Sequence, residues 1–210
     1  MESPKIRKPA VAGTFYPSSA KAIENQIKGF IGRDAQKREV IACMLPHAGY
    51  IYSGKVAVET LCGIKIKNKI ILLGPNHTGY GAHFSVMSEG IWETPLGEIK
   101  INSELAKSLL KKSQYLEDDY SAHTDEHSLE VELPILQFFK ADFEIVPIVF
   151  MSSDVGALKR VGEEIAEVIK DTGSEGSTLI IASSDMTHYE TQAQAQEKDK
   201  EAIQAILDLD

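Results

Sequence analysis

The chain has 210 residues and a mass of 23.1 kDa, a length at which one domain around one sizeable core is the rule. Hydrophobic residues make up 43% and charged residues 25% of the sequence, which excludes a disordered or fibrous chain. The formal net charge of -9 argues against a nucleic-acid-binding protein, because such binding depends on Lys and Arg that neutralise phosphates.

We expect neither a membrane span nor a secretion signal in this sequence. No stretch approaches the roughly 18–20 consecutive apolar residues that a membrane span needs, and the first five residues lead into no apolar signal core. We therefore expect a cytoplasmic protein without a membrane partner. The two cysteines, Cys43 and Cys62, give no disulfide framework, and we expect buried thiols, with a Cys43–Cys62 metal pair as the alternative.

Four apolar, β-branched runs bounded by Gly, Pro or Ser predict buried strands. They cover residues 40–45, 70–73, 143–150 and 178–181. Because polar residues do not alternate cleanly with apolar ones in these runs, we expect cover on both faces, as in parallel strands flanked by helices.

Segments with helical spacing lie between these runs. Leu105 and Leu109 follow Ser103 with the spacing of one helix face, and Asp154 is the expected cap of a second helix that includes Leu158 and Val161. This order of strands and helices predicts an α/β fold with an open, mostly parallel or mixed central sheet and helices on both faces. We expect a single domain over residues 1–210.

Shorter elements are predicted beside this framework. Residues 84–87 and 98–101 have the pattern of two strands, and the segment 92–97 between them is the expected turn of a hairpin. Residues 127–139 predict a helix that opens near Thr124 or Asp125 and is kinked by Pro134.

A histidine follows closely after each of three predicted strands. These residues are His47, His77 and His188. The carboxyl ends of parallel strands lie along one edge of a sheet, and ligands of open α/β sheets bind outside that edge. We therefore expect the three imidazoles to converge on one pocket.

Three histidines at the same edge of a sheet favour a metal-binding site. Imidazole suits Zn, Cu, Fe and Ni, and catalytic sites combine two histidines with a third donor and keep open positions. His47 and His77 are the preferred ligands, because Pro46 and the Gly74-Pro75 pair predict sharp turns just before them. The alternative is that each histidine only closes a loop through hydrogen bonds.

A fourth segment brings His123 and His127 within four residues of each other, beside Asp125 and Glu126. On a helix the two imidazoles would share one face. Acids are also favoured at a helix start by the dipole alone, and Thr124 is an ordinary cap. We expect His127 as a catalytic group, Glu126 in the substrate pocket and His123 in a loop.

The pair formed by His188 and Asp185 is the candidate for proton transfer, because a carboxylate fixes the tautomer of an imidazole that exchanges protons near neutral pH. Asp185 could instead cap the following helix or orient a metal ligand. Tyr50, Tyr52 and Asn76 complete the expected substrate pocket, although both tyrosines are equally compatible with packing.

Several segments together resemble the MEMO family, also called the AmmeMemoRadiSam system protein B family. The motifs include Leu73-Gly74-Pro75-Asn76-His77. The other matching segments are residues 7–17, 46–54, 94–97, 126–130 and 183–189. The resemblance implies a fold like that of the class III extradiol dioxygenases, which are non-haem iron enzymes. It also implies His47 and His77 as ligands of Fe(II) or Cu, with Zn as the alternative, and His188 near substrate or oxygen.

The resemblance carries further expectations. The family's third ligand, a cysteine in a later segment, would lie beyond Asp210, and neither Cys43 nor Cys62 matches it, so we expect a chain truncated at its C-terminal end. The implied function is a dioxygenase-like redox protein that acts with an AMMECR1-type protein and a radical SAM enzyme. A non-catalytic adaptor and a metal-dependent hydrolase are the alternatives.

Overall fold

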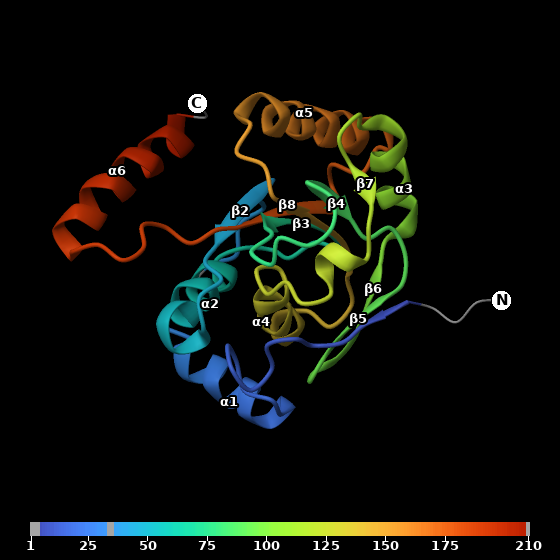
Figure 1. The fold of residues 1–210 in the computed structure, drawn as a ribbon. Helices are drawn as coiled ribbons and strands as arrows, with labels where there is room; N and C mark the ends of the chain where they lie inside the picture. The colour runs from blue at the N-terminus through green and yellow to red at the C-terminus, as the bar shows by residue number, and fades with distance from the viewer. Residues whose placement is uncertain (1–4, 33–35, 209–210) are drawn as a thin grey trace.

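A computed structural model of the protein describes residues 5–32 and 36–208 (Figure 1). The strands are β1 (Ile6–Arg7), β2 (Ala42–Leu45), β3 (Lys69–Pro75), β4 (Phe84–Val86), β5 (Ile91–Thr94), β6 (Gly97–Ile101), β7 (Glu117–Asp118), β8 (Glu144–Phe150) and β9 (Thr178–Ser183). The α-helices are α1 (Ala20–Phe30), α2 (Lys55–Cys62), α3 (Ser103–Lys112), α4 (Leu133–Phe139), α5 (Val155–Asp171) and α6 (Gln192–Asp208). A π-helical turn, η1 (Tyr50–Gly54), precedes α2, and two 3₁₀ turns are η2 (Ser121–His123) and η3 (Glu130–Glu132).

The described strands form one open, mixed sheet in the order β1-β5-β6-β8-β3-β9-β2, and β4 and β7 extend it from β8. Its centre, from β6 through β8, β3 and β9 to β2, is parallel, whereas the β5–β6 and β4–β8 pairs are antiparallel. This architecture confirms the predicted α/β class. The four predicted central strands are β2, β3, β8 and β9, at nearly the predicted bounds.

Helices lie on both sides of this sheet. In Figure 1, α3 and α5 lie on one side, and α1, α2 and α4 lie on the other. Apolar side chains of the central strands, among them Ile71, Val146 and Ile181, are fully buried between these layers. Asp154 caps α5 as predicted, because its carboxylate accepts the backbone N–H groups of Gly156 and Ala157.

The predicted hairpin was misplaced along the chain. Trp92, assigned to the turn, lies in β5 and pairs with Ile99 of β6, so that the hairpin turn is only the Pro95-Leu96 pair. Burial alternates along β5, which is the pattern of a strand with one buried face. All residues of β4 are buried, and this strand pairs antiparallel with β8 instead.

The predicted kinked helix over residues 127–139 was also wrong. The chain passes through a loop and η3 before α4 begins at Leu133, and Pro134 therefore lies in the first turn of α4. A proline is tolerated there because the first N–H groups of a helix have no partner within it. The chain before η3 forms a loop with no regular helix, and this loop carries His127.

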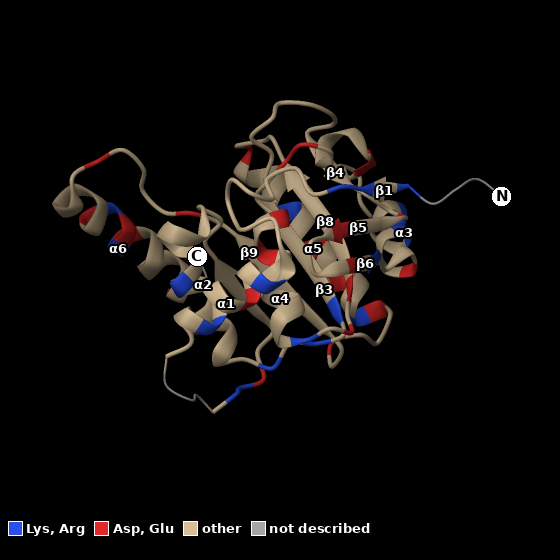
Figure 2. Ribbon diagram, turned by 90° about the horizontal axis from the view of Figure 1, so that it is seen from below, with Lys and Arg blue, Asp and Glu red and all other residues tan. Residues whose placement is uncertain are grey.

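The remaining features concern surfaces. Cys43 and Cys62, expected to be buried, are half-buried. Helix α6 extends away from the body, and its described residues include none that is buried (Figure 2). Figure 2 also shows Lys and Arg interspersed with Asp and Glu over several elements. Among the described helices, none combines the length and the apolar character that crossing a membrane requires.

Candidate metal centre

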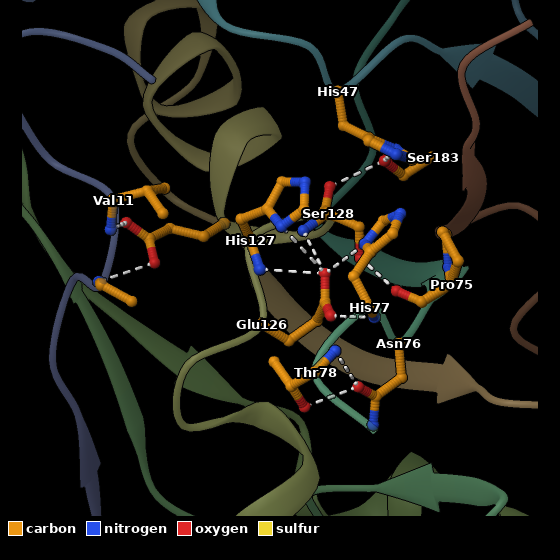
Figure 3. A network of polar contacts seen from close by, with 12 residues as sticks. Val11, His47, Pro75, Asn76, His77, Thr78, Glu126, His127, Ser128 and Ser183 are labelled. Atoms are coloured by element: carbon orange, nitrogen blue, oxygen red, sulfur yellow. Dashed lines mark hydrogen bonds and ion pairs between the residues drawn. The ribbon is translucent and has the colours of Figure 1, made fainter. Parts of the chain in front are cut away.

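Three imidazoles meet outside the carboxyl edge of the sheet (Figure 3). His47 follows β2 by two residues, His77 follows β3 by two residues, and His127 comes from the loop before η3. The ring centroids lie 5.3 Å apart for His47 and His77, 5.6 Å for His47 and His127, and 4.5 Å for His77 and His127. One nitrogen of each ring lies within 4.8 Å of the corresponding nitrogens of the other two.

His47 is the most deeply buried of the three, with 4% of its surface exposed. Its backbone N–H donates to Asp185 Oδ1 over 2.8 Å, and its Nδ1 lies 2.8 Å from Ser183 Oγ. Burial is the largest effect on its pKa and, despite the opposing charge of Asp185, holds that pKa below the ordinary value of 6.5. The ring is therefore neutral at neutral pH, which is the form that binds metal ions.

Glu126 organises the other two histidines. Its carboxylate accepts the backbone N–H groups of His77, His127 and Ser128, and His77 Nδ1 lies 2.9 Å from Oε1 (Figure 3). Burial alone would raise the pKa of Glu126, but the hydrogen bonds from His77 and Ser128 outweigh it and lower that pKa. An ionised carboxylate only accepts hydrogen bonds, so the Nδ1–H of His77 is the donor in this contact, and Nε2 is the nitrogen left for a metal ion.

His127 stacks on His77 at an interplanar angle of 27° and contacts the ring of Phe15. Burial is the main cause that lowers the pKa of His127 below 6.5, against the raising effect of Glu126. The triad thus contains at least two imidazoles that are neutral at neutral pH. Neutral imidazoles at this separation are a suitable donor set for a first-row transition metal ion.

A cavity of about 600 Å³ opens above the triad. Phe15, Tyr52 and Tyr189 contribute aromatic side chains to its lining. Asp185 and His188 lie on the same wall, with Asp185 Oδ2 3.5 Å from His188 Nε2 and 3.9 Å from His47 Nε2. His47, His77 and His188 therefore line one pocket, which is the convergence that the topology predicts.

Comparison with known proteins shows which family the chain belongs to. The family model described as Memo-like protein matches residues 7–210 of the chain. The chain belongs to the Memo family.

Relatives from distant organisms carry the same family name. A MEMO1 family protein of Methanosarcina acetivorans is 44% identical over 208 residues, which are 98% of this chain and 76% of the relative. Those of Aquifex aeolicus and Nitrosopumilus maritimus are 43% and 40% identical, over 96% and 98% of this chain and 74% and 77% of the respective relatives. All residues of the triad and the Asp185–His188 pair lie within the part that matches the Memo family.

The other residues proposed from sequence lie in different surroundings. Tyr50 is buried, and its hydroxyl donates to the Val131 carbonyl oxygen over 2.9 Å. Tyr52 is 80% exposed at the rim of the pocket. The Asn76 side chain donates to the Tyr80 carbonyl oxygen over 2.8 Å and accepts from Thr78. Asn76 therefore shapes the loop after His77.

Glu126 and His123 also differ from their expected surroundings. Glu126 is only 1% exposed and lies behind the imidazoles, where it binds backbone and ring N–H groups. His123 is fully buried in η2, and its ring contacts Trp92 at a centroid distance of 5.8 Å. It therefore lies outside the triad.

Sequence reasoning overlooked the residues that hold the His127 loop. Arg7 is fully buried, donates to the carbonyl oxygens of His123 and Glu126 over 2.9 and 2.6 Å, and pairs with Glu130. Its guanidinium carbon lies 4.5 Å from the centroid of the Trp92 ring. The Memo-family motif over residues 7–17 begins at Arg7, so the family resemblance did single out this residue. Nothing in the local sequence indicates that Arg7 is buried.

Proposed function

We propose that this Memo-family chain binds one divalent transition metal ion through His47, His77 and His127 and acts on a small molecule in the cavity above them. The proposal rests on one observation, the approach of three imidazole nitrogens to within 4.8 Å of one another. His47 is buried and His127 is half-buried, so lone pairs on these two rings are costly without a partner.

The resemblance of the family to non-haem iron enzymes favours Fe(II) or Cu, and the donor set also suits Zn. Bound there, Fe(II) or Cu would supply a redox couple, and Zn would supply a Lewis acid that acidifies water. The cavity of about 600 Å³ is within the range of about 300–1,000 Å³ typical of small-molecule sites.

Asp185 and His188 are the residues that would handle a proton. Asp185 Oδ1 accepts the backbone N–H groups of His47 and Ala48, over 2.8 and 3.2 Å, which fixes the carboxylate. Its Oδ2 then faces His188 Nε2 at 3.5 Å. Because 58% of the His188 side chain is exposed, this imidazole can exchange a proton with a substrate or with water while Asp185 orients it.

The donor set favours a second candidate, a metal-dependent hydrolase, because three histidines with an open position also form catalytic zinc sites. The two candidates differ in what they consume. Oxygen uptake with catechols as probes supports the redox protein, whereas turnover of ester or peptide probes without oxygen uptake supports the hydrolase.

Metal titration of chain purified without oxygen tests the proposal. Fe(II), Cu and Zn are titrated separately, and the bound metal is measured by elemental analysis. We expect one ion per chain, and we expect His47→Ala, His77→Ala and His127→Ala each to weaken binding by more than about 100-fold, beyond the effect of a supporting residue. His83→Ala, at an exposed histidine, is the control. Equal binding by the control and the three variants would refute the proposal.

A further inference from the structure

Ser183, the last residue of β9, lies directly behind His47 (Figure 3). It is buried, and its hydroxyl oxygen has three polar neighbours. His47 Nδ1 lies at 2.8 Å, the Ser128 carbonyl oxygen at 2.7 Å and Glu132 Oε1 at 3.4 Å. The first comes from the loop after β2 and the other two from the segment around η3, so this one hydroxyl joins three parts of the chain.

The Ser183 hydroxyl has a single proton to donate, and the carbonyl oxygen of Ser128 can accept a hydrogen bond but cannot donate one. Two oxygens approach to 2.7 Å only with a proton between them, so Ser183 donates to Ser128. If Ser183 donated to His47 instead, the contact with Ser128 would set two lone pairs against each other. Glu132 is a more distant alternative acceptor for the same proton. If Ser183 donated to Glu132, it would likewise be unable to donate to His47.

It follows that His47 Nδ1 must be the donor in its contact with Ser183. A neutral imidazole has one N–H, and the hydrogen bond made by one nitrogen determines the state of the other. With Nδ1 protonated, Nε2 keeps its lone pair. Glu126 imposes the same tautomer on His77, so two different groups, a carboxylate and a hydroxyl, prepare two members of the triad in the same way.

We infer that Ser183 is a positioning residue of the metal centre, whose hydroxyl fixes the Nδ1–H tautomer of His47 and so presents the Nε2 lone pair to the ion. This inference rests on the proposed function, because the tautomer of His47 matters only if His47 binds a metal ion. The tautomer itself is a property of the metal-free protein. Without the hydroxyl, His47 carries its proton on Nε2 in a fraction of the protein molecules. In these molecules His47 must change tautomer before it can bind the ion.

The tautomer can be measured directly on the metal-free full chain labelled with ¹⁵N-histidine. Long-range ¹H–¹⁵N correlation spectra near pH 7.5 distinguish a protonated from an unprotonated ring nitrogen. We expect His47 of the wild type to be protonated on Nδ1, Ser183→Ala to move protonation towards Nε2, and Ser183→Thr, which keeps a hydroxyl, to restore it. Ser184→Ala, the same change one residue along the chain, should leave the spectrum of His47 unchanged.

Zn titration supplies the second readout. We expect Ser183→Ala to bind one ion with an affinity about 10–100-fold lower, the range for a residue that orients a ligand, and Ser183→Thr to recover most of it. If Ser183→Ala does not fold, Ser183→Cys takes its place, because a thiol is a weaker hydrogen-bonding group.

The outcomes separate the two proposals. A wild type that binds metal, with a Ser183→Ala variant that keeps both the tautomer and the affinity, overturns the inference alone. A wild-type His47 protonated on Nε2 also overturns it. A wild type that shows the Nδ1–H tautomer, lost in Ser183→Ala, but takes up no metal refutes the proposed function and upholds the tautomer assignment.

Discussion

The substitution His123→Phe is expected to make the protein more resistant to acid. His123 is fully buried, and neither ring nitrogen has a hydrogen-bond partner among the described residues. Burial, reinforced by the nearby charge of Arg7, lowers the pKa of His123 to about 3. Phe keeps a ring of similar size against Trp92, removes the two unpartnered nitrogens and cannot take up a proton.

The size of the effect follows from the two pKa values. In the unfolded chain His123 titrates with the ordinary pKa of 6.5, and in the folded protein with a pKa of about 3. Above pH 6.5 neither state holds the proton, so this residue makes no pH-dependent contribution there. As the pH falls from 6.5 towards 3, only the unfolded state is protonated, and the free energy of unfolding decreases by about 1.4 kcal/mol per pH unit. The loss at pH 5 is therefore about 2 kcal/mol.

Urea unfolding at several pH values between 7.5 and 5.0 measures this difference. The free energy of unfolding of His123→Phe, relative to that of the wild type, should rise by about 2 kcal/mol over this interval. His83→Phe, at an exposed histidine, should follow the wild type throughout. A difference between His123→Phe and the wild type that stays constant with pH would refute the reasoning, because it would mean that the folded protein accommodates a protonated His123.

Three further changes test the surroundings of the triad. Arg7→Ala removes the cation that pairs with the buried carboxylate of Glu130, and we expect a loss of about 3–5 kcal/mol in the free energy of unfolding; an unchanged urea midpoint would contradict this. Glu126→Gln keeps the shape but removes the charge that accepts three backbone N–H groups, so Zn affinity should fall about 10–100-fold, with exposed Glu163→Gln as the control; equal affinities would argue against a supporting role. Because burial lowers the pKa values of His47 and His127, Zn binding should weaken only below pH 6.5, and a titration midpoint above 6.5 would exclude neutral buried imidazoles.

The general plan of the fold is predictable because it depends on repeated, local features. Apolar runs such as residues 70–73 and 143–150 have too little polar alternation for an exposed face, and both are central strands. The convergence of His47, His77 and His188 follows from the parallel arrangement alone, since each lies just beyond the carboxyl end of a strand. No knowledge of loop conformation is needed for that step.

The rest depends on contacts between distant loops, which the sequence does not encode locally. His127 reaches the triad because the chain before η3 is not helical, and that path depends on the buried carboxylate of Glu126 and on Arg7. Tyr50 and Tyr52 are two residues apart, yet one is buried and the other is 80% exposed. Both lie in the π-helical turn η1, and nothing in the local sequence predicts this turn.

X-ray absorption spectroscopy of the metal-loaded full chain tests the central claim most directly, because the scattering pattern of imidazole counts the histidine ligands of the bound ion. The triad predicts that His47, His77 and His127 all contribute, and that His127→Ala removes one imidazole from the count. A bound ion with no imidazole scattering, or with a count that is the same in His127→Ala and the wild type, would contradict it.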